Sequence, residues 1–383
     1  MVKVVVLGTR GFPGVQGGVE AHCENLYPRL AALGCEIVVF TRTQYVNSAI
    51  NEFKGVKLIS LSCPRNKFLE AFGHTFKGVL AAKKLRPDIL HIHAAGPSLF
   101  TPLARLLGMK VVITSHGPEH ERKKWAGFPS YVLRLAEYLS CTCANRIISV
   151  SESNAERLSK KYKREVVILP NGVRIPEITK TDGALKQYGI EKNKYILAVG
   201  RFVPEKGFGD LIEAHNDKSL DSRFRGNDKW KLVIAGRADH EDEYSRGLKE
   251  QARQTPNVVL TGFLTGQPLA ELYSHAGLFV LPSYYEGLPI ALLEAMSYGL
   301  SCVVSDIPAN REVGLPEERL FKAGDITALA GKISEYTEKP LNSEEKTLQI
   351  KSISDKYDWD KIAEKTLEVY KKAIGLSVKE KHI

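Results

Sequence analysis

The sequence lacks the features of a membrane-spanning or secreted protein. None of the apolar runs in its 383 residues approaches the length of about 20 residues needed to cross a bilayer. The apolar part of residues 1–8 is too short for a signal peptide, and these residues are expected to form a first strand. Its six cysteines form no Cys-x-x-Cys pair, which excludes a zinc ribbon and a thioredoxin motif. We therefore expect buried, reduced thiols and a cytoplasmic protein.

Composition and charge further limit the class of protein and its expected partners. Apolar residues make up 43% and charged residues 26%, which argues against disorder, a collagen-like chain and a coiled coil. Lys and Arg number 54 against 44 Asp and Glu, and the net charge of +10 favours anionic partners such as nucleotides, phosphorylated lipids or a membrane surface. No recognised nucleic-acid-binding motif accompanies this surplus, so we expect no nucleic-acid partner.

Short β-branched runs alternate with helical patterns along the whole chain. This alternation predicts crossover units and parallel sheets. A turn cluster, Leu169-Pro-Asn-Gly172, interrupts the pattern, which restarts with a strand near Lys194. The sequence therefore predicts an α/β protein with two doubly wound domains, residues 1–172 and 173–358. Residues 217–228 (DKSLDSRFRGND) show neither the helical nor the strand pattern and are expected to form an exposed loop without function.

A glycine-rich segment, GTRGFPGVQGGVE (residues 8–20), follows the first expected strand. Five glycines in eleven residues allow a close backbone approach, and the helix after Gly18 would point free N–H groups and its positive end at the loop. The spacing is not G-x-G-x-x-G, and no acidic residue ends the second strand to hold a ribose. A phosphate loop is thus favoured over a nicotinamide fingerprint, with a plain flexible loop as the alternative.

Two motifs in the second half of the chain place charged residues just after the carboxyl ends of expected strands. GRFVPEKG (residues 200–207) places Arg201 and Lys206 around a turn, where both can converge on one diphosphate or remain solvated surface cations. EGLPIALLEAMSYG (residues 286–299) predicts an almost wholly apolar helix containing Glu294. A shielded carboxylate needs partners, either a structural salt bridge or two adjacent sugar hydroxyls.

Histidines also follow the strands of the first half. His116 ends a strand and is expected to face a ligand crevice, whereas His91 and His93 are expected to be satisfied core histidines. His116 and His120 have the spacing of helical metal ligands, but Gly117-Pro118 disfavours a helix there, so no metal site is expected. Residues 122–125 (RKKW) form a basic, aromatic patch, either a solvated face or a contact for an anionic acceptor or lipid headgroups.

Together these motifs resemble the retaining family 4 glycosyltransferases of the GT-B fold over nearly the whole chain. The E-x7-E pair with GRFVPEKG upstream carries the resemblance, and residues 8–20 are similar to a bacterial subgroup that makes surface polysaccharides. The resemblance implies two Rossmann-like domains with an inter-domain cleft, the terminal helix 359–376 completing the first domain. It also implies transfer of a sugar from a nucleoside-diphosphate sugar to a saccharide or lipid-linked acceptor, without cofactor or metal.

The resemblance assigns roles to particular residues. Arg201 and Lys206 would hold the diphosphate, Glu286 would contact the donor sugar, and His116 would face the reacting carbon. The expected donor-binding residues are Gly17, Gly18, Gly236, Phe263, Leu264, Gly287, Leu288 and Glu294, of which Glu294 would accept the ribose hydroxyls. Arg174 and His120 depart from the family pattern, and their roles are left open.

Two other functions remain as alternatives. A nucleotide-sugar 2-epimerase has a similar fold and would isomerise the donor without an acceptor. A catalytically silent nucleotide-sugar-binding protein would keep the site without turnover. The basic surplus also suits a protein that sits at the inner membrane face. The sequence leaves the donor base, the sugar, the acceptor and the oligomeric state open.

Overall fold

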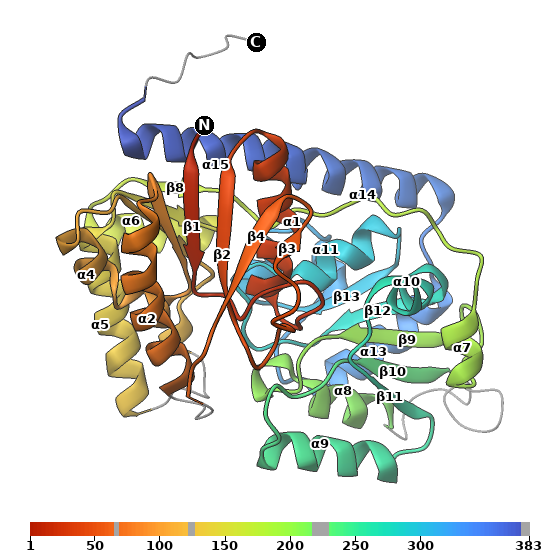
Figure 1. Cartoon of the computed structure of the whole chain (residues 1–383). Coiled ribbons are helices and arrows are strands. Elements are labelled where there is room, and N and C mark those ends of the chain that lie inside the picture. The colour runs from red at the N-terminus through yellow and green to blue at the C-terminus, as the bar shows by residue number, and fades with distance from the viewer. Residues whose placement is uncertain (65–68, 122–126, 217–229, 377–383) are drawn as a thin grey trace. The chain divides into compact units, whose positions relative to one another are not determined.

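The computed structural model describes residues 1–64, 69–121, 127–216 and 230–376, and the chain divides into two units (Figure 1). Unit 1 is Met1–Gly172 together with Trp359–Ile383, and unit 2 is Val173–Asp358. The expected loop 217–228 and the basic patch 122–125 lie outside the described residues.

Unit 1 is built on an eight-stranded sheet with the order β3-β4-β2-β1-β5-β6-β7-β8. Every neighbouring pair is parallel except β3 and β4. The order reverses at β1, which lies between β2 and β5, so a ligand crevice is expected where the carboxyl ends of these strands meet. The strands are β1 (Lys3–Leu7), β2 (Glu36–Arg42), β3 (Glu52–Phe53), β4 (Val56–Leu61), β5 (Ile89–His93), β6 (Val111–Ser115), β7 (Arg146–Ser149) and β8 (Val166–Ile168).

Helices cover both faces of this sheet because β1 is apolar on both sides. Val4 and Val6 pack in one core with α1 (Gly18–Ala32) and α15 (Trp359–Ile374), whereas Val5 and Leu7 pack in a second core on the opposite face. Four helices share that second core: α2 (Leu69–Leu85), α4 (Thr101–Leu106), α5 (Phe128–Cys143) and α6 (Glu152–Tyr162). The short α3 (Ala95–Ser98) follows β5.

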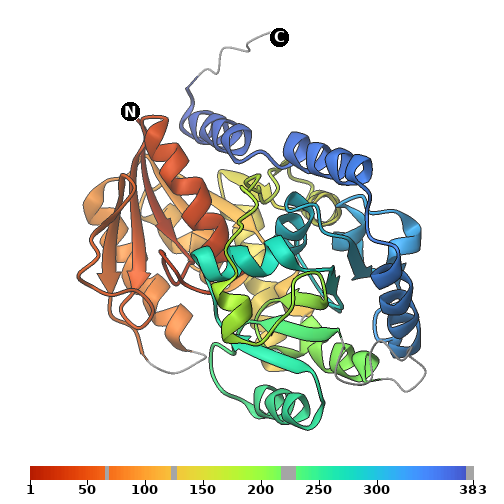
Figure 2. The same ribbon diagram turned by 90° about the vertical axis from the view of Figure 1, so that its right-hand side faces the viewer.

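The C-terminal helix α15 lies against α1, although the two are far apart in sequence (Figure 1, Figure 2). Arg29 of α1 donates to Asp360 at 2.7 Å across 331 positions of sequence. Trp359 occupies the space beside Gly172, where a Cβ atom would lie 2.5 Å from the indole ring. The glycine thus lets the indole close against the end of the N-terminal segment.

Unit 2 is a six-stranded, fully parallel sheet with the order β11-β10-β9-β12-β13-β14. Its order reverses between β9 and β12, which defines a second switch point. The strands are β9 (Tyr195–Val199), β10 (Lys231–Ala235), β11 (Val258–Gly262), β12 (Leu278–Leu281), β13 (Cys302–Ser305) and β14 (Leu320–Phe321).

The helices of unit 2 also form two layers. One layer, α8 (Phe208–His215), α9 (Glu243–Gln254) and α13 (Ile326–Glu338), shares a core with the inward residues of β9 and β10. On the other face Tyr273 of α10 (Gly266–His275) packs against Phe279 of β12. The remaining helices are α7 (Gly183–Gln187), α11 (Ile290–Ser297), α12 (Pro308–Arg311) and α14 (Ser343–Lys356).

Helix α14 is the main element that sequence patterning missed. The sequence pattern indicated no helix in these residues, but they form one that begins with a capping box between Asn342 and Glu345. Gln349 then donates to the carbonyl oxygens of Met296 and Leu300 at 3.1 and 3.0 Å, which fixes α14 against the end of α11. Capping and these bonds therefore replace the apolar periodicity that α14 lacks.

Candidate functional site

The switch point of unit 2 brings together the two charged motifs found in the sequence. GRFVPEKG follows β9, and the segment containing Glu286 follows β12. Gly207 has a φ of 65°, and a Cβ atom there would lie 2.2 Å from the carbonyl oxygen of Pro282. Glycine is thus required for the first loop to lie directly against the second.

This close approach pairs Lys206 with Glu286. Lys206 Nζ lies 2.6 Å from Glu286 Oε1, and both side chains are largely buried. The hydroxyl of Ser283 donates to the same carboxylate oxygen at 2.6 Å. Charge-assisted bonds of this kind hold a side chain in one place, so an anionic ligand that reaches Lys206 has to share it with Glu286 or take the place of Glu286.

Arg201 has its own acidic partner. Its Nη1 atom donates to Asp239 Oδ2 at 2.8 Å, and both side chains are about one-fifth exposed. Asp239 follows β10, the strand next to β9 in the sheet. Sequence reasoning missed Asp239 because no motif links it to GRFVPEKG. Both residues expected to hold the diphosphate lie at the end of β9, but each of them is bonded to a different carboxylate.

Glu294 lies on α11, beneath the same edge of unit 2. Tyr273 Oη donates to Glu294 Oε2 at 2.9 Å, and Tyr273 stacks on Tyr298 with ring centroids 5.1 Å apart. Burial raises the pKa of Glu294 to about 7, since desolvation outweighs the hydrogen bond from Tyr273. The partner is therefore a tyrosine hydroxyl and not the structural salt bridge considered from the sequence.

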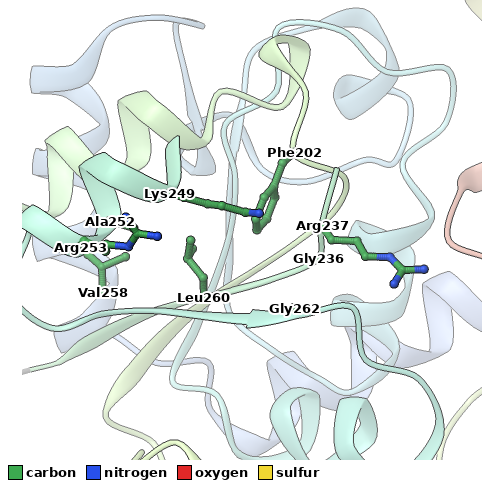
Figure 3. A pocket seen from close by; sticks show the side chains of 9 residues that line it. All are labelled: Phe202, Gly236, Arg237, Lys249, Ala252, Arg253, Val258, Leu260 and Gly262. Carbon is green, nitrogen blue, oxygen red and sulfur yellow. The ribbon is translucent and has the colours of Figure 1, made fainter. Parts of the chain in front are cut away.

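Gly236, expected near the nucleoside base, lines a cavity of about 400 Å³ in unit 2 (Figure 3). Phe263 and Leu264 follow β11 just beyond this lining, and the Arg237 guanidinium stands 5.3 Å from the centre of the Phe263 ring. Figure 3 shows that Arg237 points away from the other lining side chains. The cavity is lined by Phe202, Gly236, Arg237, Lys249, Ala252, Arg253, Val258, Leu260 and Gly262.

Gly287 and Leu288 lie in the segment that connects Glu286 to α11, and Leu288 is buried. Pro289, which suits the start of a helix, occupies the N-cap position, and α11 begins at Ile290. Gly299 follows the helix with a φ of 70°, as a helix end requires.

The glycine-rich loop of unit 1 is held in a fixed shape at the end of β1. Arg10 binds Glu20 through its backbone nitrogen at 3.0 Å and through its guanidinium at 3.2 Å. A Cβ atom on Gly17, whose φ is 148°, would lie 2.1 Å from Glu20 Oε2. The N-cap residue of α1 is Gly17, which has no side chain to cap the first turn of the helix, and α1 begins at Gly18. The loop therefore suits an anion that approaches these N–H groups.

His116 follows β6 and is 8% exposed. Its Nε2 atom lies 3.1 Å from Nδ1 of His93, the last residue of β5. The expectation that His91 and His93 are satisfied core histidines is confirmed, because both are fully buried and each ring nitrogen has a partner. The sequence did not indicate that His93 bonds His116.

The two residues that depart from the family pattern, Arg174 and His120, lie in different surroundings. Arg174 is exposed. His120 Nδ1 lies 3.7 Å from Glu137, which also accepts two bonds from Arg157 at 3.0 and 2.6 Å. These bonds hold the pKa of Glu137 at about 2 despite burial. His120 therefore belongs to an ion cluster between η1 (Glu119–Glu121), α5 and α6.

Across the described ranges of the chain, no group of three or more His, Cys, Asp and Glu side chains could hold a metal ion. Within the same part of the chain no helix has both the length and the apolarity that crossing a membrane requires.

Two parallel-sheet α/β units with ligand-type motifs at their switch points define the class as GT-B. Solved structures support this architecture. Sucrose-phosphate synthase from Thermosynechococcus elongatus has a TM-score of 0.78 at 20% identity and covers 97% of this chain and 99% of its own. HepE from Anabaena, solved in complex with UDP-glucose, has a TM-score of 0.78 at 17% identity and covers 97% and 100%.

Family models match almost the whole chain. The model described as Glycosyltransferase Family 4 matches residues 16–175, and the model described as Glycosyl transferases group 1 matches residues 182–371. The chain belongs to the family 4 glycosyltransferases and is a transferase.

Curated relatives agree with this assignment. An uncharacterized glycosyltransferase of Methanocaldococcus jannaschii is 28% identical over 98% of this chain and 99% of its own length. The UDP-Gal:alpha-D-GlcNAc-diphosphoundecaprenol alpha-1,3-galactosyltransferase of Escherichia coli is 29% identical over 60% of both chains.

Proposed function

We propose that the protein is a retaining glycosyltransferase that moves a sugar from a nucleoside-diphosphate sugar to a hydroxyl of a saccharide or lipid-linked saccharide in polysaccharide or lipopolysaccharide synthesis. The observation that carries the proposal is the Lys206–Glu286 pair at the switch point of unit 2, 2.6 Å apart. A cation and a carboxylate held side by side suit a ligand that presents a diphosphate next to sugar hydroxyls.

Two sets of relatives support the donor and the pathway. HepE is solved with UDP-glucose, which supports a nucleotide sugar as donor. The E. coli relative acts on a diphosphoundecaprenol-linked sugar, and another relative is an O-antigen chain mannosyltransferase. The first name supports a lipid-linked acceptor, and the second supports a surface polysaccharide as product.

Catalysis in this proposal rests on the leaving group. As the bond between C1 of the sugar and the diphosphate breaks, negative charge grows on the diphosphate, and Arg201, Lys206 and the amides at Gly17 and Gly18 stabilise it. This positive charge is what a metal ion supplies in other enzymes, so we propose that the enzyme works without one.

Retention requires the acceptor oxygen to bond C1 on the side that the diphosphate leaves. A phosphate oxygen of the departing nucleoside diphosphate takes the acceptor proton, which balances the step. Glu286 then serves as a binding group for the sugar, as its bond to Lys206 suggests. A double displacement through Glu286 is the alternative, and rapid-quench trapping of a sugar bound covalently to Glu286 would establish it.

The decisive test of the reaction separates transfer from isomerisation and from silent binding. Nucleotide sugars that raise the melting temperature are selected first, since a bound ligand stabilises the folded state. Release of nucleoside diphosphate is then followed with and without lipid-linked acceptors, and NMR of the product gives the anomeric configuration. Release only with acceptor, and a retained configuration, support the proposal. An acceptor-independent change of the donor sugar supports the epimerase, and an inverted product excludes the mechanism.

We also propose that unit 1 contacts the anionic inner face of the cytoplasmic membrane. On α5, four large apolar residues spaced as one helical face are between 51% and 79% exposed: Phe128, Tyr131, Leu135 and Tyr138. Arg134 is exposed between them. Glu137, the single acid of α5, is buried and paired with Arg157. The outer face of α5 is therefore apolar and cationic, as a bilayer-binding helix requires.

Helix α2, on the same side of the sheet as α5, has a similar outer face. Leu69, Phe72, Phe76 and Leu80 are between 43% and 55% exposed. Its single acid, Glu70, is buried and bonded to Arg42 at 2.8 Å, and Lys77, Lys83 and Lys84 are exposed. Exposed lysines without an exposed acid favour anionic lipid over a neutral surface.

Vesicle sedimentation tests this contact. The protein should pellet with vesicles containing anionic phosphatidylglycerol, pellet less with pure phosphatidylcholine, and be released by salt. The triple variant Phe128→Ser/Tyr131→Ser/Leu135→Ser should lose binding. Leu348→Ser, which changes an exposed leucine of α14 in unit 2, is the matched control. Binding that is indifferent to lipid charge and to the triple substitution rejects the membrane contact.

A further inference from the structure

Glu294 of α11 lies next to a pair of stacked tyrosine rings in unit 2. Tyr298 follows one helical turn after Glu294, and its backbone N–H donates to the Glu294 carbonyl oxygen at 3.1 Å. Tyr273 of α10 stacks on Tyr298 with an angle of 17° between the ring planes, and it also packs against Phe279 of β12. These contacts hold the Tyr273 ring, and with it the position of its hydroxyl oxygen.

The hydroxyl of Tyr273 has two oxygen atoms within reach. Glu294 Oε2 lies 2.9 Å away, whereas the carbonyl oxygen of Ala291 lies 3.5 Å away, near the long limit of a hydrogen bond. Tyr273 is 2% exposed, and burial together with the Glu294 carboxylate holds the pKa of Tyr273 well above its ordinary value. The hydroxyl therefore keeps its single proton, and it directs this proton to Glu294 when the carboxylate is ionised.

This bond favours the ionised form of Glu294, because a hydrogen bond to a charged oxygen is about twice as strong as a neutral one. If Glu294 takes up a proton on Oε1, the bond from Tyr273 to Oε2 becomes a neutral one. If it takes up the proton on Oε2, the new O–H faces the Tyr273 hydroxyl, whose own proton has to turn to the carbonyl oxygen of Ala291 at 3.5 Å. Protonation weakens the contact in both cases.

The other titratable groups around Glu294 do not compete with Tyr273. Burial raises the pKa of Tyr298 to about 12 and also raises that of Cys302 on β13, so both are neutral at pH 7. Lys346 of α14 packs just beyond the end of α11. In the described part of the chain no charged side chain acts on the pKa of Glu294, which burial raises to about 7 and the bond from Tyr273 lowers. Tyr273 is therefore what offsets the burial of this carboxylate.

We infer that Tyr273 is a positioning residue of the donor site, which holds Glu294 Oε2 and keeps the carboxylate ionised so that Oε1 accepts from the ribose of the donor. Glu294 is partly exposed whereas Tyr273 is buried, and among the described residues only Oε2 of this carboxylate has a hydrogen-bond partner. Tyr273 thus acts on the donor through Glu294. The inference rests on the proposed function, since it takes the ribose to be the ligand of Glu294.

Carbon-13 NMR of the full-length protein labelled at the glutamate carboxyl carbons tests the effect of Tyr273 without any donor. The signal that is lost in Glu294→Gln identifies Glu294. Its pKa should be about 7 in the native protein and about one pH unit higher in Tyr273→Phe, which removes the hydroxyl and keeps the ring. Tyr336→Phe on α13, which removes a hydroxyl that donates to the Glu318 carbonyl at 3.1 Å, should leave it unchanged. An unchanged pKa in Tyr273→Phe overturns the inference.

Donor affinity gives a second readout, measured by calorimetry with UDP-glucose or with the nucleotide sugar that thermal shift selects in its place. Tyr273→Phe should bind about fivefold more weakly than the native protein at pH 7 and nearly equally at pH 9, because its Glu294 is ionised again at the higher pH. An equal loss at both pH values would show a merely structural role and overturn the inference.

A double substitution separates this inference from the function on which it rests. In the Glu294→Gln background, Tyr273→Phe should change donor affinity little, since no carboxylate remains to be ionised. An undiminished effect of Tyr273→Phe in that background overturns the inference. A native affinity of Glu294→Gln at pH 9 would instead refute the ribose role of Glu294, whatever the NMR titration shows.

Discussion

Lys206 and Glu286 lie 2.6 Å apart although 80 positions of sequence separate them. The contact exists because Gly207 lets the loop after β9 lie against the backbone of Pro282 after β12. One loop therefore supplies the cation and the other supplies the carboxylate, at the point of unit 2 where a doubly wound sheet binds its ligand.

Removing either cation should slow turnover strongly. We expect Lys206→Ala and Arg201→Ala each to lower kcat at least about a hundredfold, because stabilisation of a leaving group is worth several kcal/mol. Initial rates of nucleoside diphosphate release measure this. Lys339→Ala, which removes an exposed lysine of unit 2 that pairs with Glu335, is the control and should stay near the native rate. Near-native rates for both site variants would contradict the diphosphate assignment.

Donor affinity should depend on pH through Glu294. Its pKa is raised to about 7 by burial. The ionised carboxylate accepts strongly from both ribose hydroxyls, whereas the protonated acid is a weaker acceptor and one of its oxygens becomes a donor. Affinity should therefore fall about tenfold per pH unit below 7 and level off above it. Calorimetry at pH 6 and 8 with a nucleotide sugar, whose diphosphate diester does not titrate near neutrality, measures this. Glu294→Gln should bind weakly and without pH dependence. An equal pH slope in both proteins would count against the ribose role.

Unit 1 should lose stability in acid. Burial lowers the pKa of His22 and His74 to about 4 and that of His91 to about 3, so the folded state resists protonation while the unfolded chain accepts it at about 6.5. This stability is complete above pH 6.5 and is lost as pH falls toward 4, at about 2 kcal/mol per histidine by pH 5.

Hydrogen exchange followed by mass spectrometry can separate the two units in this experiment. Peptides of β5 in unit 1 should lose protection between pH 7 and pH 5, after correction for intrinsic exchange. Peptides of β12 in unit 2 should not follow them, because protonation of Glu294 relieves a buried charge: its raised pKa makes unit 2 most stable below pH 4.5. Equal loss in both units would show that the buried histidines do not control acid stability.

Gly207 should tolerate no side chain. Gly207→Ala places a Cβ atom 2.2 Å from the Pro282 carbonyl oxygen at a φ of 65°, so the loop has to move away from β12 and Lys206 from Glu286. We expect lower stability and a loss of kcat similar to that of Lys206→Ala. Gly247→Ala on α9 is the control, because no atom of the described residues lies within 4 Å of the new Cβ, and it should stabilise by up to about 1 kcal/mol. Thermal unfolding measures the change in stability of each variant, and initial rates measure the change in its kcat.

Much of the fold could be read from the sequence because its strands are short apolar runs bounded by turn residues. The strand expected near Lys194 is β9 (Tyr195–Val199), and the terminal helix begins at Trp359 as expected and ends at Ile374, two residues before the expected end. Helix α14 was missed because its capping box and its bonds to the end of α11, and not an apolar stripe, hold it in place. The two-residue strands β3 and β14 are too short to carry a period.

The candidate site was accessible to sequence reasoning only in part. Glycine, cation and carboxylate motifs mark the ends of strands, since they are contiguous in the chain. Their partners are not contiguous: Asp239, Tyr273 and His93 reach Arg201, Glu294 and His116 through sheet order and helix packing. Spacing along a single sequence contains no signal for such contacts, and the hydrogen-bonded state of each site residue therefore required the structure.

The crystal structure of the protein bound to a nucleotide sugar selected by thermal shift tests the account most directly. We predict that the diphosphate lies at the end of β9, within hydrogen-bonding distance of Lys206 Nζ and the Arg201 guanidinium, with the sugar against Glu286 and the ribose at Glu294. A diphosphate bound elsewhere, or these two cations directed into solvent around a bound donor, would contradict it.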